Sequence, residues 1–376
     1  MAKAVRATQI ELDLAVQALR RGDVVAFPTE TVYGLGANAQ HEAAVQKIYA
    51  LKGRPTTHPL IVHLDSARFL HRWVREVPAA AARLAERFWP GPLTLVLPRA
   101  PNVLDLVTGG QDSVAIRVPA HPMAQQLLTA FGGGIAAPSA NRYGHVSPTR
   151  ADHVREEFGD AVRVVLDGGE CKVGLESTIV ACLHGEVRML RPGYITLTQL
   201  RREVGEVQSG PAQDAPRVPG SAMAHYAPVT PVRLIAGGQI EGLAAELSTN
   251  GGRVAVLAQR PPLGTFKHVT WINAGTRVEG YAHDLYAHLR TLDKAGANWL
   301  LVQEVPTDER WEAVRDRLAR AAAGAGTAGQ AAEDGAPEPA GTAAAAGAAA
   351  AGGAAPAAGD GGDADNADAD DFSDAP

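Results

Sequence analysis

The chain has 376 residues, of which 46% are hydrophobic and 20% charged. This composition is typical of globular proteins, and the length allows two domains with separate cores. No apolar run reaches the roughly 18 residues that span a bilayer, and the first residues lack the apolar segment of a signal peptide. The two cysteines, Cys171 and Cys182, form neither a C-x-x-C metal pattern nor a disulfide scaffold. A cytosolic protein with no membrane partner is expected.

The charge is unevenly distributed. The formal net charge is −6, and ten Asp and Glu but no Lys or Arg lie in residues 321–376, which leaves +4 for residues 1–320. A mildly basic body suits an anionic ligand. The Ala-, Gly- and Asp-rich stretch 321–376 cannot bury enough apolar surface to offset its ordering entropy, so it is predicted to be a disordered tail.

Residues 8–204 show strands interleaved with helices. Hydrophobic periodicity predicts helices at 8–20 and 41–51, and strands at 24–27, 60–64, 93–97, 114–118, 135–137, 162–166 and 178–181. The two kinds of element do not alternate as clean βαβ repeats. The expected fold is therefore a mixed, twisted α/β sheet.

A stretch rich in Pro, Gly, Gln and Ser at 205–231 indicates a linker. After it, predicted strands at 232–235, 254–258 and 299–302 alternate with predicted helices at 279–294 and 309–322. This alternation predicts a small, parallel, doubly wound, Rossmann-like domain at 232–320.

The segment FPTETVYGLGANA (27–39) contains a pattern of the dinucleotide-binding type, G-x-G-x-x-A. A dinucleotide turn requires its first glycine directly at the strand end and an acidic residue about 20 positions later. Here Pro28 to Tyr33 separate Gly34 from the strand, PTTHP (55–59) stands where the acidic residue is expected, and the first acidic residue after it, Asp65, comes late. A nicotinamide or flavin enzyme is thus the weakest interpretation, and the glycines are interpreted as turn residues that let the backbone approach a ligand.

Several polar clusters interrupt apolar strands: PTETVYG (28–34), KGRP (52–55), SAN (139–141), EST (176–178) and RPG (191–193), together with single polar residues in two strands, His63 and Arg117. Each alone has a structural explanation, such as helix capping, a satisfied core histidine or a buried ion pair. Together, arginine forks and hydroxyl groups predict a site for phosphate and carboxylate groups. No Ser-His-Asp, Cys-His or paired-His metal motif is evident, so positioning and charge stabilisation are the expected chemistry.

The motifs PTETVYGLG, LKGRP with HPLIVHL, FWPGPLTLVL, APSAN, GLESTIV and LRPG closely resemble, in this order, those of the YrdC/Sua5 family of L-threonylcarbamoyladenylate synthases. The HYAP segment (225–228) and the second domain resemble the longer, two-domain Sua5 form, and the resemblance covers residues 8–320. It implies synthesis of threonylcarbamoyl-AMP and pyrophosphate from L-threonine, bicarbonate and ATP, with Mg²⁺ accompanying the triphosphate. The product would serve N6-threonylcarbamoylation of adenosine 37 in tRNAs that read codons beginning with A, with tRNA and the downstream transferase machinery as further partners.

The resemblance also assigns site residues. The L-threonine pocket would comprise Thr31, His63, Arg117, the backbone at Ala137, and Ser177. The ATP side would comprise Arg54, His58, Ser113, Ser139, Asn141, Ser147, Arg191 and Tyr226, with Lys52 and Arg54 catalytic and Lys52 as charge stabiliser. Glu30 is expected to be structural or to support a residue that contacts the ligand, and the linker that carries Tyr226 is expected to act as a lid.

The sequence departs from the family's motifs at two places, and two alternative functions are considered. His58 stands where many members have asparagine, and VPGSAMA precedes HYAP where others have a PGMKYR-type segment with cations. One alternative is a double-stranded RNA- or tRNA-binding module without catalysis, although the body has no Lys/Arg stripe with interleaved aromatics. The other is a hydrogenase-type carbamoyl-transfer factor, whose zinc-finger cysteine pairs and acylphosphatase-like segment this sequence lacks.

Overall fold

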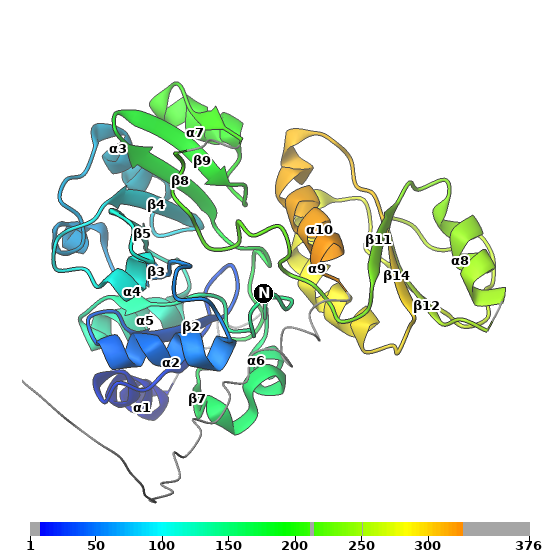
Figure 1. The fold of residues 1–376 in the computed structure, drawn as a ribbon, viewed down its shortest axis with the longest axis horizontal. Helices are drawn as coiled ribbons and strands as arrows, with labels where there is room; N and C mark the ends of the chain where they lie inside the picture. Colours follow the sequence, from blue (N-terminus) through cyan, green and yellow to red (C-terminus); the bar gives the residue numbers. More distant parts are fainter. Residues whose placement is uncertain (1–7, 211–213, 250, 326–376) are drawn as a thin grey trace, which may run out of the picture. The chain divides into compact units, whose positions relative to one another are not determined.

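The computed structural model describes residues 8–210, 214–249 and 251–325, so most of the predicted tail lies outside the described residues. Two sheets organise the described chain, one of ten strands and one of four (Figure 1). We call residues 8–210 the first-sheet region, residues 214–231 the linker, and residues 232–325 the second-sheet region. The mixed α/β fold predicted from the sequence is confirmed.

The ten-stranded sheet combines parallel and antiparallel neighbours. In spatial order its strands are β10 (Gln208–Ser209), β9 (Glu186–Arg191), β8 (Thr178–Leu183), β4 (Leu93–Pro98), β5 (Ser113–Arg117), β3 (Ile61–His63), β6 (Ile135–Ala136), β2 (Gly34–Asn38), β1 (Val25–Phe27) and β7 (Val164–Val165). Strand β5 pairs parallel with β3 and antiparallel with β4, while β4 pairs parallel with β8. Polar residues that end these central strands therefore meet at the middle of the sheet.

Helices surround this sheet: α1 (Gln9–Arg20), α2 (Glu42–Lys52), α3 (Ala79–Phe88), α4 (Asp105–Thr108), α5 (Pro122–Phe131), α6 (Ala151–Phe158) and α7 (Leu197–Val204), with short 3₁₀ turns at Ala67–Arg72 and Gly159–Ala161. Helix α1 begins with a capping box between Thr8 and Glu11. Helix α2 ends where Gly53 adopts the left-handed conformation, with φ of 61°. That cap reverses the chain and places Lys52 and Arg54 on either side of the turn.

The expectation that the glycines after PTETVY form a turn is wrong. Gly34–Asn38 forms strand β2, which pairs antiparallel with both β1 and β6. A Cβ atom on Gly36 would lie 2.6 Å from Cγ2 of Ile135 and 2.7 Å from the Phe27 ring. Glycine is needed there because neighbouring side chains fill the space above the strand.

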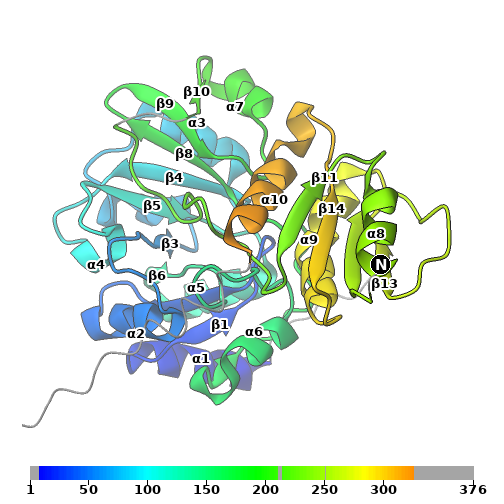
Figure 2. The ribbon, with the colours of Figure 1, turned by 45° about the vertical axis from the view of Figure 1, so that its right-hand side comes forward.

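The second sheet is parallel throughout, in the order β11 (Val232–Ile235), β14 (Trp299–Gln303), β12 (Val254–Ala258) and β13 (Val269–Asn273). Helix α8 (Ile240–Thr249) covers one face, while α9 (Val278–Asp293) and α10 (Glu312–Gly324) cover the other (Figures 1 and 2). A 3₁₀ turn at Glu309–Trp311 precedes α10. The predicted doubly wound arrangement is therefore confirmed, with α8 and β13 as elements that the pattern analysis had not identified.

Helix α10 continues to Gly324, so its last turn lies in the range predicted to be tail. Ala321 is completely buried there, which explains why the helix extends past the predicted end. Residues 326–376 of that tail are outside the described residues.

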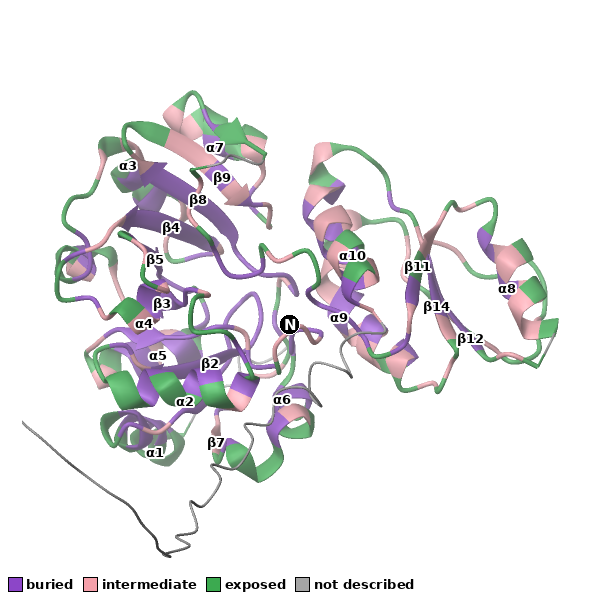
Figure 3. Cartoon of the chain, in the orientation of Figure 1, coloured by how far each residue is buried: buried purple, intermediate pink, exposed green. Residues whose placement is uncertain are grey.

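The central strands of both sheets are buried (Figure 3). One hydrophobic cluster extends across the two regions: Val32, Val146 and Leu175 of the first-sheet region pack with residues of α9 and α10. Linker residue Tyr226 is in the same cluster. The two regions therefore share part of a core, and burial of this shared apolar surface stabilises their contact.

Candidate active site

The polar clusters that the sequence analysis identified converge on one cavity of about 40 Å³ in the first-sheet region, closed from one side by the linker. Most of the predicted site residues line it: Thr31, Arg54, His63, Arg117, Ala137, Ser139, Ser177, Arg191 and Tyr226. Strand register explains part of this convergence, because His63 and Arg117 are direct partners at the ends of parallel strands β3 and β5.

Five predicted residues do not line this cavity: Lys52, His58, Ser113, Asn141 and Ser147. Ser113 opens β5, whereas Arg117 closes it, so the two side chains lie roughly 13 Å apart at opposite ends of the strand. Ser113 instead borders a separate, wider cavity of about 1090 Å³. The structure thus does not bring Ser113 to the predicted ATP side.

Lys52 and Asn141 lie immediately behind the cavity wall. The Lys52 ammonium donates to the carbonyl oxygens of Ser139, at 2.7 Å, and of Asn141. The Asn141 amide donates to the carbonyl oxygens of Arg142 and His145. These bonds give both residues a direct role in shaping the SAN loop.

His58 and Ser147 also lie outside the cavity lining, each with its own partner. His58 is half-buried, and its Nδ1 lies 3.3 Å from the Tyr143 hydroxyl. Ser147 is completely buried and donates to Oε1 of Glu176 at 2.6 Å. Glu176 does line the cavity, so Ser147 contacts the site through it.

Arg117 is held by two neighbours from the PTETVYG segment. Its guanidinium donates to the Thr31 hydroxyl at 2.8 Å and to Oε1 of Glu30 at 2.7 Å. The other carboxylate oxygen of Glu30 accepts the Ala120 backbone N–H at 2.9 Å. Through these contacts Glu30 fixes the guanidinium fork at the cavity edge.

His63 is neutral in the folded protein. Burial, followed by repulsion from Arg117, lowers the pKa of His63 to about 3. Its Nδ1 lies 3.2 Å from the Ile61 carbonyl oxygen. A neutral imidazole beside a fixed guanidinium can recognise a hydroxyl group while the arginine binds a carboxylate.

Three buried cations, Lys52, Arg54 and Arg191, have no ion pair with a carboxylate within the described residues. Burial lowers the pKa of each, and Arg54 adds to the effect on Lys52. Arg54 donates to the Pro59 carbonyl oxygen, while Arg191 donates to the carbonyl oxygens of Ser177 and Pro219. Positive charge held this way favours an anionic ligand.

Several buried polar atoms beside the cavity lack hydrogen-bond partners among the described residues: Arg54 Nε, Asn141 Oδ1, His225 Nδ1 and the Tyr226 hydroxyl. Unpaired buried polar atoms cost free energy, and native proteins leave few of them. Their grouping around one cavity indicates that a polar ligand completes them.

The linker forms one wall of the cavity. Pro219, Gly220, His225 and Tyr226 line it, and Tyr226 adopts a left-handed backbone conformation with φ of 60°. The Ala227 N–H donates to the Gly144 carbonyl oxygen at 2.8 Å, which ties the linker to the first-sheet region. The cavity volume of about 40 Å³ is smaller than the several hundred Å³ typical of small-molecule sites, and the linker bounds the cavity on one side.

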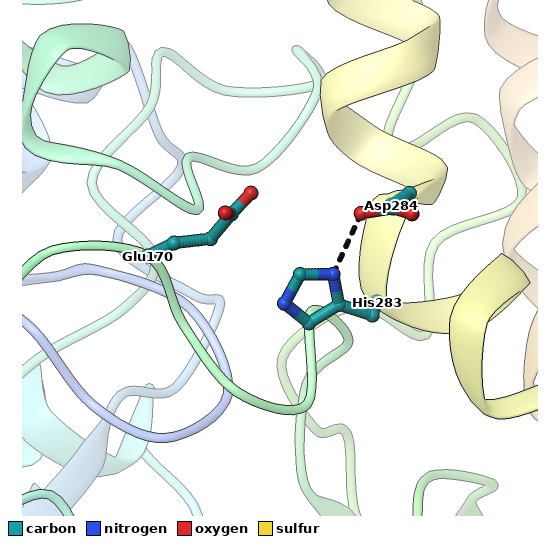
Figure 4. Close-up of side chains that lie close together, drawn as sticks. All are labelled: Glu170, His283 and Asp284. Atoms are coloured by element: carbon teal, nitrogen blue, oxygen red, sulfur yellow. Dashed lines mark hydrogen bonds and ion pairs between the residues drawn. The ribbon is translucent and has the colours of Figure 1, made fainter. Parts of the chain in front are cut away.

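A possible metal-ligand group lies elsewhere, formed by Glu170, His283 and Asp284 (Figure 4). Glu170 already accepts two hydrogen bonds from Arg150, and His283 Nδ1 lies 2.6 Å from Asp284 Oδ1. None of the three lines the cavity. Among the described residues there is also no helix with the length and apolar character to cross a membrane.

Sequence reasoning placed Glu176 in the EST cluster without giving it a role, and it did not select Tyr286 or Arg317, both of which donate to Glu176 beside the cavity. The GLEST motif was a signal for Glu176. Tyr286 and Arg317 lie within ordinary amphipathic helices of the second-sheet region, where no local pattern distinguishes them from core residues.

Comparison with known proteins agrees with this architecture. Residues 17–193 match the Sua5/YciO/YrdC family model, described as telomere recombination, and residues 195–323 match the C-terminal domain model of threonylcarbamoyl-AMP synthase. A threonylcarbamoyl-AMP synthase of Pyrococcus abyssi is 39% identical over 84% of this chain and 95% of its own, and one of Bacillus subtilis is 39% identical over 82% and 92%.

A solved structure supports the same relationship. Pyrococcus abyssi Sua5 complexed with L-threonine superposes with a TM-score of 0.79 at 38% identity, over 85% of this chain and 96% of that one. Both family models, the extent of the matches and the shared fold lead to one conclusion: the chain belongs to the threonylcarbamoyl-AMP synthase family, in its two-domain Sua5 form.

Proposed function

We propose that the cavity described above is where this enzyme joins L-threonine, bicarbonate and ATP into threonylcarbamoyl-AMP and pyrophosphate. One observation carries this assignment: three buried cations, which have no carboxylate partner in the described part of the chain, lie next to a fixed arginine fork and a neutral histidine. The three cations suit a triphosphate, and the arginine fork together with the histidine suits a hydroxylated amino acid. The names of the relatives and the bound L-threonine in one of them support the proposal.

The threonine half is built from β3, β5 and the PTETVYG segment. Arg117 binds the carboxylate through guanidinium N–H groups that Thr31 and Glu30 leave available. His63 and the nearby hydroxyls of Thr31 and Ser177 recognise the threonine hydroxyl. Because such a site leaves its polar groups unpaired with valine, it discriminates strongly against analogues that lack the hydroxyl.

The nucleotide half is built from the turn after α2, the SAN loop, Arg191 and the linker. Arg54 and Arg191 contact phosphate oxygens, and the Tyr226 hydroxyl gains the partner that it lacks among the described residues. Lys52 holds the SAN loop through two carbonyl oxygens and adds positive charge behind it. Asn141 and Ser147 position the same wall, while Ser113 is left out of this assignment.

The reaction requires no protein nucleophile. The threonine amine attacks the bicarbonate carbon and releases water, which yields a carbamate. A carbamate oxygen then attacks the α-phosphorus of ATP, and the bond to the departing pyrophosphate breaks. The protein orients the two substrates and stabilises charge on the phosphate oxygens, which are the effects that pre-placed cations supply.

Mg²⁺ is expected to accompany the triphosphate rather than to occupy a protein cage. Glu176 is the single carboxylate among the residues that line the cavity in the described chain, and both of its oxygens already accept hydrogen bonds. The lining therefore does not fit a protein-held magnesium site. Triphosphate oxygens and water are the ligands that Mg²⁺ commonly uses in such sites.

The product serves formation of N6-threonylcarbamoyladenosine at position 37 of tRNAs that read codons beginning with A. We place this activity in the cytosol, in agreement with two buried free cysteines. A downstream enzyme that transfers the threonylcarbamoyl group to tRNA would consume the product, with or without direct contact with this chain.

The test is pyrophosphate release from ATP, Mg²⁺ and bicarbonate with L-threonine, without it, and with serine or valine in its place. We expect release that requires both threonine and bicarbonate, with valine inactive. Binding of tRNA by folded protein that shows no threonine-dependent release would instead favour the RNA-binding module.

A further inference from the structure

A buried glutamate, Glu176, connects the nucleotide half of the cavity with the second-sheet region. Oε1 of Glu176 accepts from the Ser147 hydroxyl at 2.6 Å, and Oε2 accepts from the Tyr286 hydroxyl at 2.8 Å and from Nε of Arg317 at 3.0 Å. Tyr286 lies on α9 and Arg317 on α10. We call Glu176, Ser147, Tyr286 and Arg317 the Glu176 junction.

Arg317 is unusual for an arginine because its side chain is 0% exposed. Besides Glu176, it donates to Oδ2 of Asp316 at 2.6 Å, while its Nη2 has no partner among the described residues. Its guanidinium carbon lies 5.2 Å from the centre of the Tyr226 ring, which is within cation–π range. The second-sheet region therefore places the buried Arg317 guanidinium against the ring of the linker residue Tyr226.

Tyr286 contacts the same linker residue from another side. Its ring stacks on Tyr226 with a centroid distance of 5.7 Å and an interplanar angle of 25°. The Tyr226 ring thus lies against Tyr286 and Arg317 together, and these two also hold Glu176. A movement of Tyr226 must disturb groups that orient Ser147.

From this geometry we propose that Tyr286 and Arg317 are positioning residues for the nucleotide: through Glu176 and Tyr226, the second-sheet region sets the shape of the ATP side of the cavity. The inference rests on the proposed function, because it assumes that this half of the cavity takes ATP. It gives the second-sheet region a defined part in the reaction although none of its residues lines the cavity.

The Glu176 junction is connected more directly with the nucleotide half of the cavity than with the threonine half. Ser147 and Tyr226 belong to the nucleotide half, whereas Arg117 is fixed separately by Thr31 and Glu30. Loosening the junction should therefore weaken ATP binding more than threonine binding. A purely structural role would affect both substrates alike or would change only stability.

Tyr286→Phe removes one hydroxyl and keeps the ring stack, and Tyr281→Phe is its matched control. Tyr281 is also completely buried on α9, and its hydroxyl has no hydrogen-bond partner among the described residues. We expect Tyr286→Phe to raise the KM for ATP about fivefold, because the hydrogen bond from the Tyr286 hydroxyl to the Glu176 carboxylate is lost. The KM for L-threonine should change less than twofold by the same reasoning, and Tyr281→Phe should change neither KM.

Arg317→Lys extends the test, because lysine keeps the charge but cannot donate through Nε. Dissociation constants of a non-hydrolysable ATP analogue, measured on the wild type and all three variants, give a readout independent of turnover. Unchanged analogue affinity in both Tyr286→Phe and Arg317→Lys would overturn the inference, as would equal losses for ATP and threonine. A wild type that binds the analogue but releases no pyrophosphate would refute the proposed function, while the analogue affinities would still decide this inference.

Discussion

At the scale of single residues, the site consists of groups that are costly to keep buried. Lys52, Arg54 and Arg191 are nearly inaccessible, and burial lowers the pKa of each. Their main partners are backbone carbonyl oxygens, which compensate a buried charge only in part. A site that retains such residues is arranged for a ligand rather than for stability of the free protein.

This arrangement predicts opposite effects on binding and stability for Arg54→Met. The substitution removes a buried cation that, within the described residues, donates one side-chain hydrogen bond, to the Pro59 carbonyl oxygen, and whose Nε has no partner there. We expect the free energy of unfolding without substrate to stay within about 1 kcal/mol of wild type or to rise, since relief of burial offsets the lost bond. Threonine-dependent pyrophosphate release should fall by a factor of about 100 or more, as removal of a charge-stabilising group does elsewhere. Urea titration and turnover assays measure the two effects, and near-normal turnover would contradict the proposed role.

At the scale of elements, packing between strands explains the glycines of strand β2, which the local sequence pattern assigns to a turn. The glycines in GLGAN look like turn or dinucleotide-loop residues, yet they lie in a strand between β1 and β6. Gly34 and Gly36 both face the Phe27 ring. Packing against Phe27 of the neighbouring strand β1 therefore explains why glycine occupies these positions. The local sequence pattern does not show which strand will lie alongside.

Gly36→Ala tests this explanation. The added methyl group would lie 2.6 Å from Ile135 and 2.7 Å from Phe27, so we expect a loss of about 1–3 kcal/mol in the free energy of unfolding. Gly242→Ala is the control, because Gly242 is exposed in α8 with no atom near its Cβ position. That change should stabilise the protein by about 0.5–1 kcal/mol. Equal effects of the two substitutions in urea titrations would refute the packing explanation.

At the scale of the whole molecule, the two regions and the linker share a core, and the Glu176 junction connects the two regions. Burial raises the pKa of Glu176, but Arg317, Arg191 and hydrogen bonds from Ser147 and Tyr286 lower it below its ordinary value overall. The carboxylate is therefore ionised at neutral pH. Its contribution to stability is present above a pH of about 4.5 and is lost as the pH falls below that value.

Buried histidines extend the loss of stability to milder acid, and His63 and His225 are two of them. Burial lowers the pKa of His63 to about 3 and that of His225 well below its ordinary value. Both stay neutral in the folded protein, while the unfolded chain takes up protons below a pH of about 6.5. Stability should thus be fully present above that pH and should fall by up to about 1.4 kcal/mol per pH unit for each histidine below it.

Unfolding free energies at pH 7, 6 and 5 measure this dependence. His63→Gln should reduce the slope by the contribution of one proton, because glutamine does not titrate in this range. The same slope in wild type and variant would contradict the neutral state assigned to His63.

The sequence by itself determined the class of fold, the small doubly wound second-sheet region and the family. Strands can be predicted from short apolar runs. Polar motifs such as KGRP and APSAN can be recognised from residue types at fixed spacing, without knowledge of the rest of the fold. Such local signals also pointed to most residues that line the cavity.

The tertiary structure alone decided which residues meet. Ser113 and Arg117 share one strand, yet only Arg117 reaches the cavity, because the strand carries them to opposite ends. Tyr286 and Arg317 reach Glu176 from more than 100 positions away. Contacts between elements distant in the sequence follow from how sheets and helices pack, and no local pattern of residues encodes them.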